Sequence, residues 1–515
     1  MLPERQLQFS FTQNSDILKN RYDEYRDYMR RIADVKYAAA VLQWDQETYL
    51  PPKGASFRGQ QLATLSEIAH ELFVKPSFGD LLKTLVADPS LEAVQKRNVA
   101  LTLEDFDKNG KYPSAFVRRM SEATSTAYHA WIAARKENDF RVFEKPLADL
   151  VALKREEAHL LGFKHHPYDA LLNEFEKGAT VAWLDNLFRE IRPVLKNILD
   201  GIMRKPAPPA DFLHQHFDKD AQWKFGLDLL KIMGFDFEAG RQDISEHPFT
   251  TNFSTLDVRV TTRIDENDFA SMAWSCLHEG GHALYEQGLP EGQYGLPLGE
   301  FCSLGIHESQ SRLWENCIGR GLPFISYIMP LVKRYFPQLA NAEARQLFAA
   351  VNKVQPSLIR TEADELTYHF HVVIRYEIEK KLIDGSLEVK DLPGYWSALY
   401  KELLGVTVPG DRQGCLQDIH WSHGSFGYFP TYTLGSLYAA QFFAYVKKQF
   451  PDLDQQTAQG DFSALHSWLR KNIYQYGRRY TSEELCNKIT GEPLNLDHFR
   501  QYITEKYSLV YQSSL

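Results

Sequence analysis

Apolar residues recur every three or four positions along most of this chain, which predicts amphipathic helices. In the first such segment, capping residues Asn14, Ser15 and Asp16 precede apolar side chains at positions 18, 22, 25, 29 and 32. That spacing places the side chains on one helix face, and Pro51 and Pro52 mark the end of the segment. The same periodicity predicts helices at 56–74, 114–136, 143–161, 181–203, 219–234, 340–354, 361–384 and 433–449.

One segment alternates instead. Val258, Val260 and Thr262 lie two positions apart within 254–264, between charged or polar residues, which predicts a β-strand. The proline-rich stretch 205–212 predicts a loop, and the helical pattern resumes at 267–288. We therefore expect a mostly helical fold with a small antiparallel sheet beside the helix at 267–288.

Composition narrows the class of protein. The chain has 515 residues, 44% of them apolar, and a net charge of −9 without an obvious basic face, so nucleic acid is not an expected partner. It has no run of 18 apolar residues, so we expect no membrane span. Its five cysteines form no C-x-x-C pair, and its first residues lack the apolar core of a signal peptide. These features predict a cytoplasmic protein with reduced thiols.

The strongest chemical signal is the pentapeptide HEGGH at 278–282. Residues four apart share a helix face, so His278 and His282 are expected to bind one zinc ion, with Glu279 as general base for a water molecule there. Zinc lowers the pKa of bound water, and the carboxylate accepts its proton as the water attacks a carbonyl. The third histidine of metzincins is excluded, because Tyr285 and Gly288 occupy the positions that follow in that pattern.

Two glycines, Gly280 and Gly281, separate the histidines inside this predicted helix, where glycine is unfavourable. They would allow another backbone segment, or a substrate, to approach the helix closely. A tight packing contact without a role in function is the alternative interpretation.

A glutamate from a following helix is the expected third ligand. We favour Glu308, in the segment HESQSR, because apolar neighbours place part of that segment in the core, where a carboxylate needs a cation. Glu300 and Glu315 are competing candidates. An ion pair between Glu308 and Arg312, four residues later, is the structural alternative.

HEGGH followed by HESQSR resembles the carboxypeptidase Taq family of zinc metallocarboxypeptidases, of the HEXXH type. Further family motifs occur in the same order along nearly the whole chain. They are the W-D-x-E-T stretch at 44–48, D-x-R-x-T at 257–261, I-R-x-x-A-D at 359–364 and G-x-x-Q-D-x-H-W at 414–421. Leu50, after the first of them, stands where methionine is more usual.

The resemblance implies a helical peptidase fold like that of neurolysin and angiotensin-converting enzyme, with a deep substrate groove between two helical halves. We expect a single catalytic domain, 1–515, with halves at 1–210 and 211–515. The resemblance also implies a homodimer that removes C-terminal residues from peptides with broad specificity. Zinc would be the metal, with cobalt able to substitute, held by His278, His282 and Glu308 beside the base Glu279.

A carboxypeptidase must bind a free α-carboxylate, which the planar guanidinium of arginine matches with two hydrogen bonds. Arg360 is the preferred candidate. Arg259, on the predicted strand, is expected to contact substrate backbone or to pair with Asp257. For each arginine, a salt bridge in the core is the alternative.

An oxyanion needs hydrogen-bond donors, and the glycine-containing loop after residue 418 is rich in them. We assign Tyr428 to oxyanion stabilisation and His420 to substrate backbone binding, with ordinary aromatic packing as the alternative. Asp364 and Asp418 are both candidates for orienting the metal-binding imidazoles, and the sequence does not choose between them.

Two other functions fit the same motifs. A zinc oligoendopeptidase or dipeptidyl carboxypeptidase would share the metal site, and would still cleave a peptide whose C-terminus is an amide. An inactive helical scaffold would bind no zinc and would be unaffected by loss of Glu279. The full set of ligands and base favours the metallocarboxypeptidase.

Overall fold

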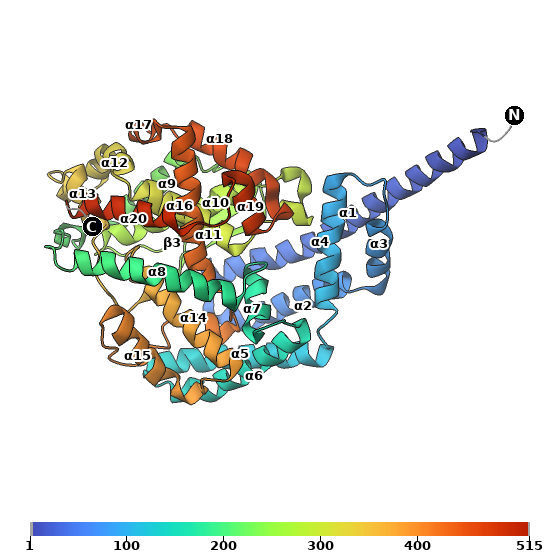
Figure 1. Ribbon diagram of the computed structural model, residues 1–515, viewed down its shortest axis with the longest axis horizontal. Helices are drawn as coiled ribbons and strands as arrows, with labels where there is room; N and C mark the ends of the chain where they lie inside the picture. The colour runs from blue at the N-terminus through green and yellow to red at the C-terminus, as the bar shows by residue number, and fades with distance from the viewer. Residues whose placement is uncertain (1–3, 513–515) are drawn as a thin grey trace.

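Helices dominate the part of the chain that the computed structural model describes, residues 4–512 (Figure 1). The first ten are α1 (Glu4–Thr48), α2 (Ala55–Phe73), α3 (Pro76–Val86), α4 (Ala93–Asn109), α5 (Ser114–Glu137), α6 (Arg141–Leu161), α7 (Pro167–Phe175), α8 (Val181–Ile202), α9 (Lys219–Ile232) and α10 (Phe269–Gly288). The others are α11 (Leu304–Arg312), α12 (Leu322–Tyr335), α13 (Ala344–Val351), α14 (Tyr368–Asp384), α15 (Leu392–Leu404), α16 (Pro430–Gln449), α17 (Leu453–Ala458), α18 (Ser463–Asn472), α19 (Ser482–Thr490) and α20 (Leu496–Val510). The strands are β1 (Gly240–Ile244), β2 (Thr250–Ser254) and β3 (Asp257–Thr262).

The predicted apolar faces become buried helix faces. In α8, Leu184, Phe188 and Ile191 are buried at intervals of four and three residues. The helix begins where the Thr180 side chain accepts a hydrogen bond from the backbone N–H of Trp183, and it ends before the proline-rich loop. Local periodicity therefore identified this helix correctly.

Two helix starts differ from the prediction. The helix expected from Asn14 already begins at Glu4. The helix expected from residue 361 begins only at Tyr368, because a 3-10 turn covers Arg360–Glu362 and Asp364 accepts hydrogen bonds from the backbone N–H groups of Leu366 and Thr367. Such side-chain-to-backbone bonds compete with helix formation.

The sheet is mixed, which corrects the expected antiparallel arrangement. Its strand order is β1-β3-β2, with β1 parallel and β2 antiparallel to the central β3. The chain reverses between β1 and β2 and again between β2 and β3, so β3 runs in the direction of β1. The strands β1 and β2 escaped prediction because each is only five residues long and lacks a clear apolar alternation.

Two hydrophobic cores lie at different ends of the molecule. The larger joins residues from α5 to α20 and includes α10, α11, α14 and α16. A smaller core forms between α1, α3 and α4, where Tyr25, Phe78, Leu82 and Val99 are buried (Figure 1). Within residues 4–512, no helix combines the length and apolar character needed to cross a membrane.

Candidate metal centre and active site

Helix α10 carries the HEGGH motif and packs directly on α11. A side chain at Gly281 would place its Cβ 2.6 Å from the backbone oxygen of Gln310 and 2.7 Å from the Cα of Ser311. At Gly280 the space is filled by the side chains of Leu230 in α9 and of Met233 directly after it. Gly281 therefore permits the close approach of another backbone segment, one of the alternatives predicted from the sequence, whereas Gly280 makes room for side chains.

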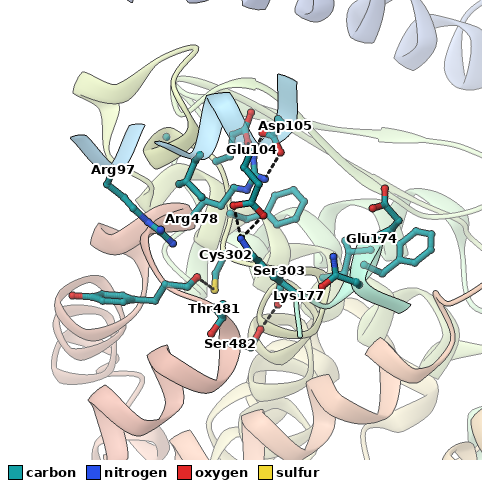
Figure 2. Close-up of a pocket in the computed structure, with 18 of the residues that line it drawn as sticks. Arg97, Glu104, Asp105, Glu174, Lys177, Cys302, Ser303, Arg478, Thr481 and Ser482 are labelled. Atoms are coloured by element: carbon teal, nitrogen blue, oxygen red, sulfur yellow. Dashed lines mark hydrogen bonds and ion pairs between the residues drawn. The ribbon is translucent and has the colours of Figure 1, made fainter. Parts of the chain in front are cut away.

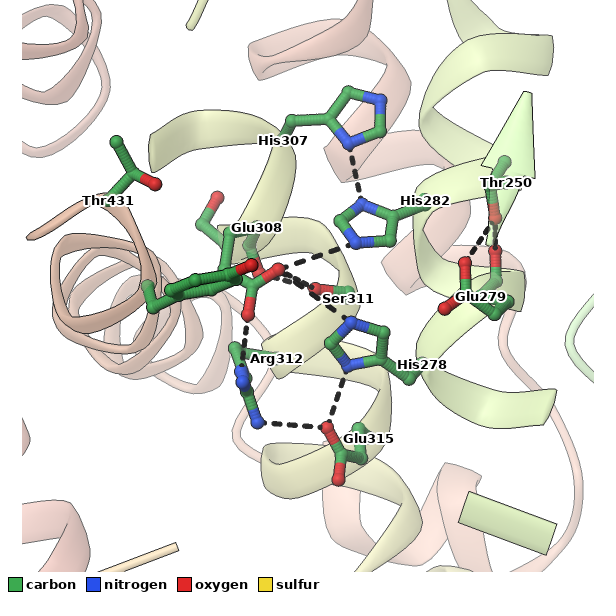
Figure 3. Close-up of polar contacts among 12 residues, drawn as sticks. Thr250, His278, Glu279, His282, His307, Glu308, Ser311, Arg312, Glu315 and Thr431 are labelled. Atoms are coloured by element: carbon green, nitrogen blue, oxygen red, sulfur yellow. Dashed lines mark hydrogen bonds and ion pairs between the residues drawn. The ribbon is translucent and has the colours of Figure 1, made fainter. Parts of the chain in front are cut away.

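Three side chains that the sequence singled out converge between α10 and α11. One donor atom from each of His278, His282 and Glu308 lies within 4.8 Å of the others (Figure 3). The Nε2 atoms of His278 and His282 lie 3.7 and 3.4 Å from the Glu308 Oε2 atom. Two imidazole nitrogens and one carboxylate oxygen are the donor set of a catalytic zinc site, so these residues fit a divalent cation.

The other nitrogen of each imidazole is already engaged. His278 Nδ1 lies 2.8 Å from Glu315 Oε2, and His282 Nδ1 lies 2.6 Å from His307 Nδ1. His307 Nε2 in turn lies 2.7 Å from Glu286 Oε1. These contacts fix the orientation of both rings and leave both Nε2 atoms directed at Glu308, as residues that hydrogen-bond the metal-binding histidines do in other metal sites.

The aspartates predicted for this orienting role make other contacts. Asp364 accepts hydrogen bonds from backbone groups at the start of α14, and Asp418 pairs with two arginines. Glu315 takes the role at His278 because a π-helical segment, Leu313–Gly319, continues α11 and returns it to the face that carries Glu308. The spacing of seven residues was the available signal, since it corresponds to about two helical turns.

Glu308 is both a candidate ligand and the partner of Arg312. The Arg312 Nε atom donates to Glu308 Oε1 over 2.7 Å, while Glu308 Oε2 faces the imidazoles. Burial alone would raise the pKa of Glu308, but Arg312 and then His278 hold it well below its usual range. The sequence analysis treated the ion pair with Arg312 as an alternative to metal binding. In the structure, Glu308 pairs with Arg312 through one oxygen and keeps the other oxygen at the candidate ligand position.

Glu279 lies on α10 beside the converging donors and is 7% exposed. Its Oε2 accepts a hydrogen bond of 2.6 Å from the Thr250 hydroxyl, so strand β2 holds the carboxylate (Figure 3). Burial raises the pKa of Glu279, which His278 and Thr250 only partly oppose. A buried carboxyl with a raised pKa is suited to proton transfer near neutral pH.

The two candidate arginines both form salt bridges within the protein. Arg360 is 6% exposed, and its guanidinium pairs with Asp418 at 2.9 Å and donates to the Tyr368 hydroxyl. Arg375 shares the same aspartate at 2.6 Å, so two cations face one carboxylate. Arg259 pairs with Asp257, which is one of the two contacts predicted for it.

Arg259 also stacks on an aromatic residue of the first family motif. Its guanidinium lies 4.3 Å from the centre of the Trp44 ring, and Arg241 from the parallel strand β1 lies 5.5 Å from the same ring. Trp44 therefore joins α1 to the sheet by cation–π contacts.

His420 and Tyr428 lie together in the loop before α16. Their rings are 5.2 Å apart, and His420 Nε2 lies 3.0 Å from the Tyr432 hydroxyl. Burial and then Arg360 lower the pKa of His420 to about 3, so its imidazole is neutral. Burial and then the Glu308 charge raise the pKa of Tyr428 to about 12, so its hydroxyl remains a proton donor.

A cavity of about 500 Å³ is lined by charged residues such as Asp105, Lys177 and Arg478, and by none of the three candidate ligands (Figure 2). Glu286, the partner of His307, lines it together with Asn252 of β2. Ion pairs cross its walls, including Arg478–Asp105 at 2.6 Å. The sequence analysis missed these residues because they are far apart in the chain and carry no local motif.

Comparisons with known proteins identify the family of this chain. The model of the family described as carboxypeptidase Taq (M32) metallopeptidase matches residues 24–507. Thermostable carboxypeptidase 1 of Thermus thermophilus is 38% identical over 506 residues, covering 95% of this chain and 99% of that protein.

Solved structures share the fold. The structure of CHT is 61% identical with a TM-score of 0.93, and covers 95% of this chain and 99% of its own. An M32 carboxypeptidase from Deinococcus radiodurans is 38% identical with a TM-score of 0.94, over 96% of this chain and all of that one. The chain therefore belongs to the carboxypeptidase Taq (M32) family of metallopeptidases and is a metallocarboxypeptidase.

Proposed function

We propose that this enzyme removes C-terminal residues from peptides with broad specificity, using zinc, or cobalt in its place, held by His278, His282 and Glu308. The observation that carries the proposal is the convergence of these three donors beside a buried general base, Glu279. When bound, the cation supplies a Lewis acid that polarises the scissile carbonyl and lowers the pKa of water.

Glu279 accepts a proton from the water that attacks the carbonyl carbon, and returns a proton to the nitrogen that leaves. Thr250 holds one oxygen of this carboxylate by a hydrogen bond, which orients the other oxygen toward the reacting atoms. The neighbouring histidines keep their Nε2 atoms free because Glu315 and His307 occupy their Nδ1 atoms.

Tyr428 donates a hydrogen bond to the oxygen of the tetrahedral intermediate, and His420 binds substrate backbone. The raised pKa of Tyr428 keeps its proton in place throughout the neutral range. Arg360 is our candidate for binding the free α-carboxylate, because Asp418 alone offsets Arg360 and Arg375 and leaves one positive charge in excess. Arg259 is a secondary candidate for contact with substrate backbone.

Several expectations remain part of this proposal. The enzyme would act as a cytoplasmic homodimer on peptides with a free C-terminus, without nucleic acid or membrane partners. The five cysteines, all within the described residues, form no disulfide, in keeping with a reducing compartment. A single catalytic domain with helical halves at 1–210 and 211–515 remains our expectation for its organisation.

A C-terminal ladder assay combined with metal analysis tests the proposal. Glu279→Gln should retain its metal and lose at least about a thousandfold in kcat, since it removes the general base. Glu308→Ala should lose metal affinity. Glu67→Gln, on an exposed position of α2, is the control and should match the native protein.

A matched peptide with a C-terminal amide separates the functions. The proposal expects that the amide blocks release of the last residue. Unchanged cleavage of the amide would instead indicate an endopeptidase, and an unaltered Glu279→Gln protein without bound metal would indicate an inactive scaffold.

A further inference from the structure

The loop that carries His420 and Tyr428 is irregular apart from a 3-10 turn at His420–His423. Gly424 and Gly427 have positive φ angles of 70° and 102°, which favour glycine. Such a loop needs contacts from outside itself to hold two side chains at fixed positions.

A single carboxylate provides these contacts. Glu379, on α14, is fully buried. Its Oε1 accepts a hydrogen bond of 2.8 Å from the indole N–H of Trp421, and its Oε2 accepts one of 2.8 Å from the backbone N–H of Gly427. The Tyr168 hydroxyl of α7 donates to Oε2 as well. Trp421 directly follows His420, and Gly427 directly precedes Tyr428, so both functional positions are attached to Glu379.

The chemistry of this contact requires a carboxylate. Three donors converge on one side chain, and an ionised carboxylate has only acceptor sites. Glutamine would place its NH₂ group against a donor. The described residues provide no cation within ion-pair distance of Glu379, so its charge is balanced by hydrogen bonds, and an uncompensated charge of this kind is costly to bury.

The loop is also fixed from its other side. A Cβ atom at Gly427 would lie 2.6 Å from the backbone oxygen of Leu171 in α7. The backbone at Gly427 is therefore held between α7 and Glu379, and has little room to shift in either direction.

We propose that Glu379 is a positioning residue for the hydrolytic reaction, which holds His420 and Tyr428 in register with the metal centre through Trp421 and Gly427. The inference rests on the proposed function of Tyr428 and His420. According to this inference, a buried residue of α14 that does not touch the substrate affects the rate of the chemical step.

Glu379→Gln tests this inference, with Glu377→Gln as the matched control. Glu377 lies on the same helix and pairs with Arg192 and Lys380, away from the loop. We expect Glu379→Gln to lower kcat by roughly 10- to 100-fold, less than complete loss of an oxyanion donor, with smaller change in KM and an unchanged metal content. Glu377→Gln should leave all three near their native values. An unchanged kcat for Glu379→Gln, measured well below the unfolding temperature, would overturn the inference.

A double-mutant cycle separates positioning from general destabilisation. In a Tyr428→Phe or His420→Ala background, Glu379→Gln should cost much less in kcat than it does alone, because part of what it positions is already missing. Equal fold losses in all backgrounds would show a structural role only, and would contradict the inference.

Two further results keep the test decisive. If Tyr428→Phe alone leaves kcat unchanged, the proposed function of Tyr428 fails, and the His420 cycle then decides whether Glu379 acts through His420. If Glu379→Gln does not fold, Trp421→Phe removes one donor while keeping an aromatic ring. It should lower kcat several-fold with metal content unchanged, and native kcat in that variant would refute the inference.

Discussion

The two walls of the active site are built in different ways. On one wall, α10 and α11 meet backbone to backbone at Gly281, and every side chain that orients the imidazoles comes from residues 278–315. On the other wall, the loop with His420 and Tyr428 is held by Tyr168 and Glu379, which lie far away in the sequence.

This difference explains which features follow from sequence. The ligand wall uses spacings of four and seven residues on helices, which a single sequence displays. The loop wall depends on tertiary hydrogen bonds between residues far apart in the chain, which produce no periodic pattern in the sequence. Perturbing each wall should therefore give distinct results, with metal affinity reporting the first and kcat at constant metal content reporting the second.

The largest effect is expected at the helix contact. Gly281→Ala forces a Cβ against the backbone of α11, which cannot move aside as a side chain can. We expect destabilisation of about 3 kcal/mol and loss of metal affinity, measured by thermal unfolding and metal titration. Gly280→Ala, which meets only flexible side chains of α9, should be milder on both measures. Similar results for the two variants would contradict a backbone contact.

The orienting carboxylate on the same wall comes next. Glu315→Gln weakens the partner of His278 and also removes a charge that pairs with Arg312 and Arg320. Metal affinity should fall roughly 10- to 100-fold, as for other outer-shell partners. Competition with a chelator measures it. Asp364→Asn is the comparison, and an equal loss of affinity there would restore the original assignment of the orienting role.

On the loop wall, Gly427→Ala should act on catalysis. The positive φ and the nearby oxygen of Leu171 make alanine strained there, at a cost of about 1–3 kcal/mol. We expect a reduced kcat with native metal content, determined by steady-state kinetics and metal analysis. Gly424→Ala shares the positive φ without a close backbone neighbour, so a smaller loss in that variant supports the steric explanation.

The smallest effect concerns pH, because each wall is contacted by a buried carboxyl whose pKa is raised to about 7. Burial raises the pKa of Glu176, which accepts a hydrogen bond from the Gly305 N–H at the start of α11, and of Glu379, in each case to about 7. Between about pH 4.5 and 7 these two carboxyls bind more protons in the folded state than in the unfolded state, so their contribution to the free energy of unfolding falls as pH rises through this range. Buried His420, whose pKa is lowered to about 3, contributes with the opposite sign below about pH 6.5.

Denaturation at pH 5 and pH 7 measures this dependence. Glu176→Gln and Glu379→Gln should each remove a decrease of about 2 kcal/mol between these pH values. The exposed variant Glu67→Gln should leave it intact. Variants whose pH dependence equals that of the native protein would show that the hydrogen bonds to the carboxylates outweigh their burial.

The difference between local spacing and tertiary contacts also determines how much of this structure could be predicted from the sequence. Helices such as α8 and the candidate ligands His278 and His282 followed from local spacing, and Glu308 followed from its apolar neighbours and from the family resemblance. The parallel pairing of β1 with β3 and the late start of α14 did not, because they depend on chain reversals and on Asp364 bonding to backbone. Glu315 was predicted as a competing candidate for the third ligand. In the structure it contacts the imidazole ring of His278 instead.

Residues 278–315 form one continuous stretch of chain, and this affects how binding of a metal ion can be measured. The three candidate ligands and every side chain that contacts their imidazoles belong to one uninterrupted run of chain, so filling the ion position should tighten that run first. Amide hydrogen exchange in peptides from this region should then slow when the metal ion binds. Exchange in the loop around Gly427 should not change.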